Sequence, residues 1–216
     1  MRYAELQVTS NFSFLRGASH PEELTEQALQ YGYDAIAITD RNTLAGIVRA
    51  HTFARKKNIK FIPACRLDLK DGPGLLMYPT DKAAYSQLSN LLTKGNLRTE
   101  KGKCDLYKQD VYEYCKGSRF IVIPPSLNAK FDFDDEFKRD LKEYKEVFGD
   151  QLFIAASRVY SGDDAKKLAR IHQLGKQLGV PMVATNDVYY HHPERRELQD
   201  VVACVRGECT IHNAGY

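Results

Sequence analysis

Apolar and polar positions along the chain alternate between the two-residue period of strands and the three-to-four-residue period of helices. Residues 3–9 alternate strictly between apolar and polar side chains, which predicts a strand with one polar face. The next periodic segment begins with Ser19 and Glu22 at the spacing of a capping box, has Pro21 in its first turn, and ends at Gly32. It predicts an amphipathic helix soon after the first strand.

Further segments repeat this alternation to the end of the sequence. Strands are predicted at residues 35–39, 61–69, 75–78, 120–123, 152–157 and 182–185. Helices are predicted at residues 44–57, from 81 onward, 110–115, 133–148, 168–178 and 198–205, with a basic loop at 94–103. Strands that alternate with helices through right-handed connections form a parallel sheet, either open and doubly wound or closed into a barrel. A strand count near seven favours the barrel, and the absence of an internal repeat or a composition break favours one domain.

Composition narrows the class of protein without identifying a partner. Of 216 residues, 43% are hydrophobic and 27% are charged, which is ordinary for a globular protein. The 31 basic and 28 acidic residues are balanced, so the net charge of +3 does not indicate nucleic-acid binding. No apolar run approaches the ~20 residues of a membrane span, and the first segment lacks the apolar region of a signal peptide. We therefore expect a cytoplasmic protein with no membrane partner.

Two motif searches have negative results. The five cysteines are an odd number without a C-x-x-C pair, which indicates neither a disulfide framework nor a zinc ribbon, and we expect reduced thiols: Cys65, Cys104, Cys115, Cys204 and Cys209. The sequence also lacks the glycine-rich phosphate-binding motifs and the G-x-S-x-G nucleophile motif. Nucleotide binding or serine hydrolysis by these routes is therefore not supported.

Polar side chains collect at the carboxyl ends of five predicted strands, where parallel barrels carry their chemistry. They are Gln7, Thr9, Ser10, Asp40, Arg41, Cys65, Arg66, Ser157, Arg158, Asn186 and Asp187. A single polar residue in such a place is most often a turn residue, but five strand ends together indicate a site. Arg66 and Arg158 would be desolvated at the edge of an apolar strand unless a carboxylate meets them, and Asp40 and Asp187 are the natural partners.

Three long segments carry a resemblance to a known family: AELQVTSNFSFLRGASHPEEL, AIAITDRNTLAGIVRAH and VATNDVYYHHPERRELQDVVACVRGECTI. They resemble the amino-terminal polymerase and histidinol phosphatase (PHP) domain of bacterial C-family DNA polymerases, most closely that of the error-prone members. The resemblance implies an α/β fold, a distorted seven-stranded (β/α) barrel over residues 1–205. It implies that residues 206–216 begin the connection to a polymerase region absent from this chain.

The resemblance also marks where active PHP domains hold two or three metal ions with histidines and carboxylates. The corresponding positions here are Gln7, Thr9, Asp40, Arg41, Arg66, Asp187 and Tyr189. Only the two aspartates keep the residue type of a ligand. Imidazole and carboxylate groups bind metals through lone pairs, whereas a guanidinium has only donors and a permanent charge. We therefore expect a vestigial, catalytically silent site with no cofactor, and Mg²⁺ only in the polymerase region of the parent protein.

Two surviving aspartates without a metal would repel each other in a pocket of low dielectric. We expect Arg41, Arg66 and Arg158 to supply the neutralising charge. The partners implied are the rest of the polymerase chain, a DNA primer-template bound through the parent, and other mutagenesis or replisome subunits.

The alternative is a metal-dependent phosphoesterase or 3′-5′ exonuclease. Such an enzyme would use Asp40 and Asp187, with His191 and His192 as the remaining ligands. Adjacent histidines in an extended segment point in opposite directions, so at most one of them could join Asp187. Metal content and chelator-sensitive cleavage of a phosphoester distinguish the two hypotheses.

Overall fold

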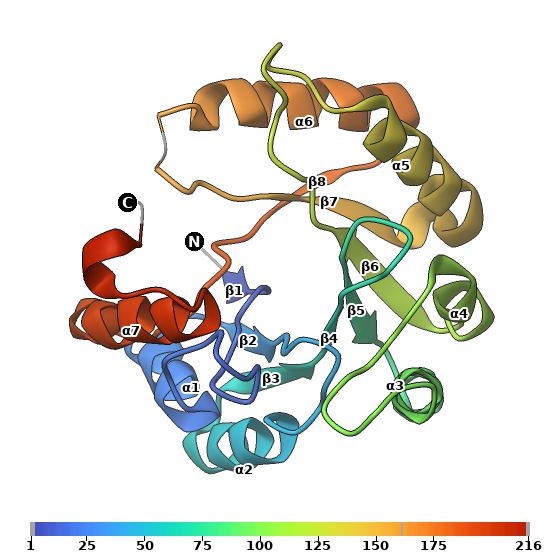
Figure 1. Cartoon of the computed structure of the whole chain (residues 1–216). Coiled ribbons are helices and arrows are strands. Elements are labelled where there is room, and N and C mark those ends of the chain that lie inside the picture. The colour runs from blue at the N-terminus through green and yellow to red at the C-terminus, as the bar shows by residue number, and fades with distance from the viewer. Residues whose placement is uncertain (1–2, 161, 215–216) are drawn as a thin grey trace. The chain divides into compact units, whose positions relative to one another are not determined.

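The computed structural model describes residues 3–160 and 162–214 (Figure 1). The chain forms two compact units. Unit 1 combines the two ends of the sequence, residues 1–65 and 186–216. Unit 2 is the continuous middle segment, residues 66–185.

Unit 1 is built on a parallel three-stranded sheet in the order β1-β2-β3. Its strands are β1 (Ala4–Glu5), β2 (Ala35–Ile38) and β3 (Lys60–Pro63). Its helices are α1 (Pro21–Gln30), α2 (Ile47–Lys57) and α7 (Arg196–Arg206), with short 3-10 turns η2 (Pro193–Arg195) and η3 (Ile211–Asn213). An isolated parallel bridge joins Val8 to Val188, so the beginning of the chain pairs with a segment near its end.

Helices α1 and α2 pack against each other and against the sheet of unit 1 (Figure 1). The apolar positions of both helices recur every three or four residues and face the strands. The buried cluster that results contains Val8, Leu24, Ala28, Ile36, Ile38, Ile47, Ala50, Ala54 and Ile59. This packing fixes the first two strands, whose ends carry the candidate site.

The sequence signals at the start of α1 are confirmed with a shift of one residue. The N-cap is His20 rather than Ser19, and the Glu23 carboxylate accepts a hydrogen bond of 2.8 Å from the His20 backbone N–H. Pro21 takes the first helical position, where its missing N–H has no partner to lose. Ser19 does not cap the helix, and its hydroxyl instead contacts His191, as described below.

Unit 2 is built around a mixed sheet in the order β4-β5-β6-β7-β8. The strands of this sheet are β4 (Cys65–Leu67), whose first residue is counted with unit 1, β5 (Leu75–Pro79), β6 (Ser118–Val122), β7 (Leu152–Ala156) and β8 (Met182–Ala184). Its helices are α3 (Lys82–Leu97), α4 (Lys108–Glu113), α5 (Asp135–Phe148) and α6 (Asp164–Leu178), with the turn η1 (Gly149–Gln151). Strands β6, β7 and β8 are parallel, whereas β5 and β6 are antiparallel, a departure from the all-parallel sheet predicted from the alternation.

The prediction of one continuous strand over residues 61–69 is wrong. The segment forms two strands, β3 and β4, which belong to different sheets and are separated at Ala64. Pro63 ends β3, and a proline has no backbone N–H to continue a ladder. Continuous apolar character therefore does not reveal a change of sheet.

The basic loop expected at residues 94–103 is also partly wrong, because α3 continues to Leu97. The N-cap predicted for this helix is confirmed: the Asp81 carboxylate accepts from the Ala84 backbone N–H at 2.8 Å. Contacts of Lys94 and Arg98 with α4 account for the longer helix, as discussed below.

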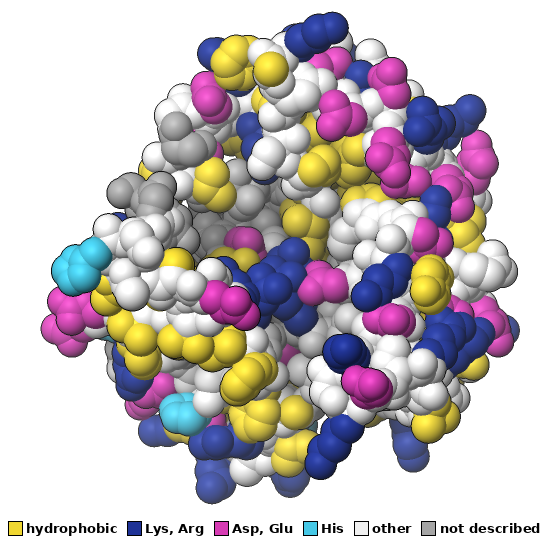
Figure 2. Space-filling model, viewed as in Figure 1, with side chains coloured by type: hydrophobic (Ala, Val, Ile, Leu, Met, Phe, Trp, Pro, Cys, Tyr) yellow, Lys and Arg dark blue, Asp and Glu magenta, His cyan; other side chains and the backbone are white. Residues whose placement is uncertain are grey.

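Helix α7 carries the last apolar stripe of the sequence, but much of that stripe is exposed. The exposed fractions of Leu198, Val201 and Val205 are 43%, 43% and 56%. Hydrophobic side chains are visible over this part of unit 1 in Figure 2. No helix of the described residues is long and apolar enough to cross a membrane.

Candidate functional site

The segment at residues 7–10 is held between two neighbouring segments of unit 1. The backbone N–H of Thr39 donates to the Val8 carbonyl at 2.7 Å, and that of Thr9 donates to the Val188 carbonyl at 2.8 Å. The N–H of Val188 returns a bond of 2.9 Å to the Gln7 carbonyl. The ends of three segments therefore meet, as predicted for the polar groups that follow them.

Asp40, at the end of β2, is buried and held by serine donors. Its Oδ1 accepts from the Ser10 backbone N–H at 2.8 Å and from the Ser13 Oγ at 2.6 Å. Its Oδ2 accepts from the Ser10 Oγ at 2.7 Å. Ser10 was recognised in the sequence as a strand-end residue, whereas Ser13 carries no periodic signal and was missed.

The environment of Asp40 acts on its pKa in two directions. Burial raises the pKa above its usual value, because the charged form loses its hydration. The hydrogen bonds from Ser13 and Ser10 lower the pKa, but they cancel only part of the increase that burial causes. Asp40 is therefore a desolvated carboxyl group stabilised by neutral donors.

Gly46, at the start of α2, makes this arrangement possible. A Cβ atom at this position would lie 2.7 Å from Asp40 Oδ2 and 3.2 Å from Ser10 Oγ. The backbone of Gly46 has φ of −77°, which any residue can adopt. The requirement for glycine here comes from the close approach of the carboxylate and not from backbone conformation.

Asp187 lies in a second cluster next to the first. Gln7 Nε2 donates to its Oδ1 at 2.7 Å, and the Tyr189 hydroxyl donates to its Oδ2 at 3.2 Å. Asp187 has φ of +50°, in the left-handed region. Three positions of the predicted vestigial site, Gln7, Asp187 and Tyr189, are thus in direct contact.

The predicted neutralising arginines are distributed over both units. Arg41 belongs to unit 1, where its backbone N–H donates to Ser13 Oγ at 2.9 Å. Arg66 and Arg158 belong to unit 2. Arg66 Nε donates to Asp68 Oδ1 at 3.0 Å, and Arg158 is exposed beyond the end of β7. The pairing of these arginines with Asp40 and Asp187 stays a prediction.

The residues present do not fit the metal cluster of an active PHP domain. Gln7 and Thr9 replace imidazole ligands, and Gln7 uses its amide N–H on Asp187. Across residues 3–160 and 162–214, no three or more histidine, cysteine, aspartate or glutamate side chains are grouped so as to hold a metal ion. His191 and His192, the alternative ligands, make other contacts: Ser19 Oγ lies 2.8 Å from His191 Nδ1, and His192 Nδ1 accepts from the Glu194 N–H at 3.5 Å.

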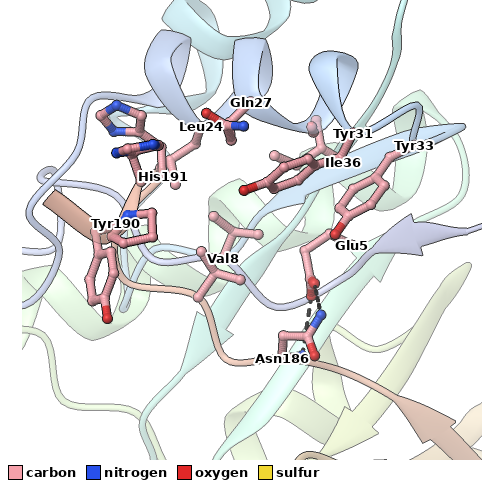
Figure 3. A pocket seen from close by; sticks show the side chains of 14 residues that line it. Glu5, Val8, Leu24, Gln27, Tyr31, Tyr33, Ile36, Asn186, Tyr190 and His191 are labelled. Carbon is pink, nitrogen blue, oxygen red and sulfur yellow. Dashed lines mark hydrogen bonds between the residues drawn. The ribbon is translucent and has the colours of Figure 1, made fainter. Parts of the chain in front are cut away.

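His191 also lines a pocket of about 230 Å³ in unit 1, between α1 and the segment at residues 186–193 (Figure 3). Val8, Leu24 and Ile36 supply apolar surface, with Tyr31 near one end. Burial lowers the pKa of His191, which favours its neutral form. The pocket is mostly apolar, and Glu5 is the one carboxylate among the described residues that line it.

Glu5, at the edge of this pocket, is a buried structural carboxylate. It accepts from the Asn186 Nδ2 at 2.6 Å (Figure 3). It also accepts from the Tyr3 hydroxyl at 2.9 Å and from the backbone N–H groups of Leu6 and Gln7 at 3.1 and 3.2 Å. The polar face predicted for the first strand is therefore buried rather than solvated: Glu5, Gln7 and Thr9 are each at most 3% exposed. Glu5 joins the beginning of the chain to residue 186.

The PHP domain family model matches residues 5–158, well over half of the chain, and the chain belongs to the PHP domain family. The Error-prone DNA polymerase of Caulobacter vibrioides is 49% identical over 99% of this chain and 19% of its own length. Error-prone DNA polymerase 2 of Agrobacterium fabrum is 44% identical over 100% of this chain and 19% of its own length. The chain thus spans about a fifth of the length of these curated relatives.

Solved structures share the fold at low identity. An amidohydrolase from Chromobacterium violaceum superposes with a TM-score of 0.62 at 14% identity, over 87% of each chain. A candidate metal-dependent phosphoesterase from Bifidobacterium adolescentis gives 0.63 at 13% identity, over 89% of this chain and 88% of its own. These likenesses support the fold alone. The α/β, PHP-like distorted barrel class predicted from the sequence is confirmed.

Proposed function

We propose that this chain is the amino-terminal PHP portion of an error-prone, DNA-directed DNA polymerase, and that this portion is structural and catalytically silent. The first half of the proposal is supported by identities of 43–49% to several error-prone polymerases along nearly the whole chain. The second half is supported by the donor set at the positions where active relatives bind metals.

One observation carries the assignment of a silent site. Both oxygens of Asp40 accept hydrogen bonds from serine donors, and Asp187 accepts one from Gln7. A metal-binding carboxylate needs a free lone pair directed at the ion together with other ligands of the same kind. Here, among the described residues, the groups around the two aspartates are neutral hydroxyls and an amide that donate to them, and they include none of the imidazole or additional carboxylate ligands that a PHP metal cluster uses.

The test is an assay for the alternative activity, metal-dependent phosphoester cleavage. The purified chain is incubated with a fluorogenic phosphomonoester and with a 5′-labelled DNA strand, in Mn²⁺, Zn²⁺ or Mg²⁺, with and without EDTA. We expect no chelator-sensitive turnover and no near-stoichiometric metal by elemental analysis. Chelator-sensitive cleavage by the wild-type chain would refute the silent site.

A matched gain-of-function variant makes a negative result informative. It combines Gln7→His, Thr9→His, Arg41→His and Arg66→Glu, which restores the ligand types of active relatives. Measurable binding of Mn²⁺ or Zn²⁺ by this variant, against none for the wild type, shows that the assay detects a working site. The single change Gln7→His is the control, since one ligand added to Asp187 does not make a site.

The parent reaction is template-directed nucleotidyl transfer, with Mg²⁺ bound in a region outside this chain. Primer extension by the complete gene product, on an intact template and on one with an abasic site, tests this assignment and its role in translesion synthesis. A gene product without polymerase activity would contradict it.

The partners and cellular place follow from the same proposal. The rest of the polymerase chain is the first partner, DNA primer-template is bound through it, and replisome or mutagenesis subunits are further candidates. A polymerase of this kind acts on DNA in replication and repair, so we propose a cytoplasmic location. Affinity purification with the complete protein, with and without nuclease treatment, separates direct partners from those held by DNA.

A further inference from the structure

Two of the five cysteines are brought together at the carboxyl end of α7. The backbone N–H of Cys209 donates to the carbonyl of Cys204 at 3.0 Å, and the N–H of Glu208 donates to that of Val205 at 3.3 Å. Glu208 has φ of +52°. This pair of bonds and the left-handed residue between them define a Schellman motif, in which the first and last residues characteristically contact each other through their side chains.

The backbone bond limits the separation of the two cysteines. With N and O 3.0 Å apart, covalent geometry keeps the Cα atoms of Cys204 and Cys209 within about 7 Å. A disulfide forms without backbone movement only when the Cα atoms are closer than about 7 Å. A straight helix would hold residues five apart farther away, so the motif and not the sequence spacing makes the approach.

The side chains of this pair also face each other. A Cβ placed on Gly207 would lie 3.4 Å from the Cys209 Sγ and 3.8 Å from the Cys204 carbonyl oxygen, so the Cys209 side chain folds back over the helix end. Burial and the neighbouring Cys209 thiol raise the pKa of Cys204, which keeps it protonated. Cys209 is the more accessible of the two, and Cys204 is buried.

The other cysteines have different surroundings. Cys65 is buried and donates to the Asp40 carbonyl at 3.3 Å. Burial raises the pKa of Cys104 to about 11 and also raises that of Cys115, whose Sγ donates to the Tyr112 carbonyl at 3.1 Å. A thiol with a raised pKa is a poor first nucleophile towards peroxide at neutral pH, so Cys104, Cys115 and Cys204 should not react first. Cys204 enters only in the second step, where the helix end holds it close to Cys209.

We propose that Cys204 and Cys209 are a modification site, a thiol pair that a peroxide oxidises to an intramolecular disulfide. The Cys209 thiolate attacks one peroxide oxygen, so that an S–O bond forms, the O–O bond breaks and water leaves after protonation. Cys204 then attacks the sulfenic sulfur: the S–S bond forms, the S–O bond breaks, and the Cys204 proton leaves with a second water. Two thiols and one hydrogen peroxide thus give one disulfide and two waters.

Trypsin provides a direct test, because Arg206 lies between the two cysteines. The reduced chain is treated with hydrogen peroxide, free thiols are alkylated, and the protein is digested without reductant. We expect the peptide 197–206 to be linked to the peptide that begins at Gly207, and the link to disappear after treatment with dithiothreitol. Cys65, Cys104 and Cys115 should be recovered mainly as alkylated thiols.

Variants at Glu208 test the geometry while both cysteines stay in place. Glu208→Gly accepts the left-handed conformation without strain and should form the disulfide at least as fast as the wild type. Glu208→Val disfavours the left-handed conformation, so this variant should form the disulfide more slowly than the wild type, by roughly fivefold. In the variants Cys204→Ser and Cys209→Ser the linked peptide should be absent.

Three results would overturn the proposal, two of them chemical and one kinetic. One is oxidation of Cys204 and Cys209 to separate sulfinic acids with no linked peptide. Another is a disulfide that joins either residue to a different cysteine or to a second molecule. Equal rates in the two Glu208 variants would show that the helix end does not direct the reaction, and would also refute it.

Discussion

Buried carboxylates of unit 1 are stabilised by neutral donors supplied from nearby segments. Asp40 uses Ser10 and Ser13, whereas Glu5 uses Tyr3, Asn186 and two backbone N–H groups. A buried charge without such partners would cost several kcal/mol, so each donor has a measurable role. Substitution of a donor residue should therefore reveal how much each hydrogen bond stabilises the fold.

The first prediction concerns Ser13. Ser13→Ala removes a 2.6 Å hydrogen bond to buried Asp40 and should lower the free energy of unfolding by about 2 kcal/mol at pH 7. It also raises the pKa of Asp40 further. A raised carboxyl pKa lowers the stability of the folded state only as the pH rises through that pKa. The loss of stability caused by Ser13→Ala should therefore be smaller at pH 4 than at pH 7.

Urea denaturation at both pH values measures this difference. Ser126→Ala, at an exposed serine, is the control and should change stability by less than about 0.5 kcal/mol. A loss for Ser13→Ala that is equal at pH 4 and pH 7 would contradict the role assigned to the hydroxyl.

The second prediction concerns the close approach at Gly46. Gly46→Ala places a methyl group 2.7 Å from Asp40 Oδ2 and should destabilise the chain by about 1–3 kcal/mol through displaced groups. Gly74→Ala is the matched control, because its Cβ would meet no atom closer than 3.5 Å. Thermal unfolding of the two variants compares them directly, and similar midpoints would argue against a tight site.

At the scale of elements, a polar network joins the end of α3 to the start of α4. Asp110 accepts from Arg98 in a two-pronged contact, from Lys94 at 3.1 Å and from the Tyr107 backbone N–H at 3.1 Å. The Arg98 hydrogen bond is the main cause that lowers the pKa of Asp110 to about 2. This network explains why residues predicted as a basic loop continue the helix.

The third prediction follows from that pKa. Asp110→Asn should lower the free energy of unfolding by about 1–2 kcal/mol at pH 7, since the partly exposed cations are screened by solvent. A depressed carboxyl pKa stabilises the fold above the unfolded value and ceases to do so as pH falls through the folded value. The wild type and variant should therefore converge between about pH 4 and pH 2.

Thermal midpoints across that pH range test the convergence. Asp150→Asn is the matched control: its ion pair with Lys145 joins a carboxylate that is 99% exposed, and its removal should have little effect at any pH. A constant difference between Asp110→Asn and wild type down to pH 2 would contradict the assignment.

Helix ends, and strands whose whole apolar run lies in one sheet, were predictable because local sequence signals determine them. Gly149 and Gly179 end α5 and α6 with positive φ, as their places in the sequence indicate. The break between β3 and β4 was not predictable, because both segments are equally apolar and only their pairing differs. The antiparallel direction of β5 and β6 is likewise a property of tertiary pairing, which the alternation of elements does not encode.

For the whole molecule, stability should come from ordinary packing and not from a metal. The fourth prediction is that EDTA leaves the thermal midpoint of the wild-type chain unchanged. Scanning calorimetry in EDTA and in excess Zn²⁺ measures this. A midpoint lowered by several degrees in the chelator would show that metal binding is part of the folding free energy and would contradict the silent site.

The candidate site was predictable in its position but not in its chemistry. Strand ends drew attention to Gln7, Asp40 and Asp187, but the partner of Asp187 was expected to be an arginine, whereas Gln7 donates to it in the structure. Ser13 lies in a loop without periodicity, so no pattern could assign it to Asp40. Contacts between residues 30 or 180 apart depend on tertiary folding, and local sequence rules do not reach that far.

The bridge between Val8 and Val188 has a consequence for synthesis of the protein on the ribosome. At ordinary elongation rates, the 180 residues between them take roughly 10 to 40 s to add. During that time the middle segment can fold by itself, while one edge of the first strand has no partner. An unpaired edge with apolar neighbours attracts other strands, so we expect the segment around Val8 to be open to wrong pairing until Val188 has been added.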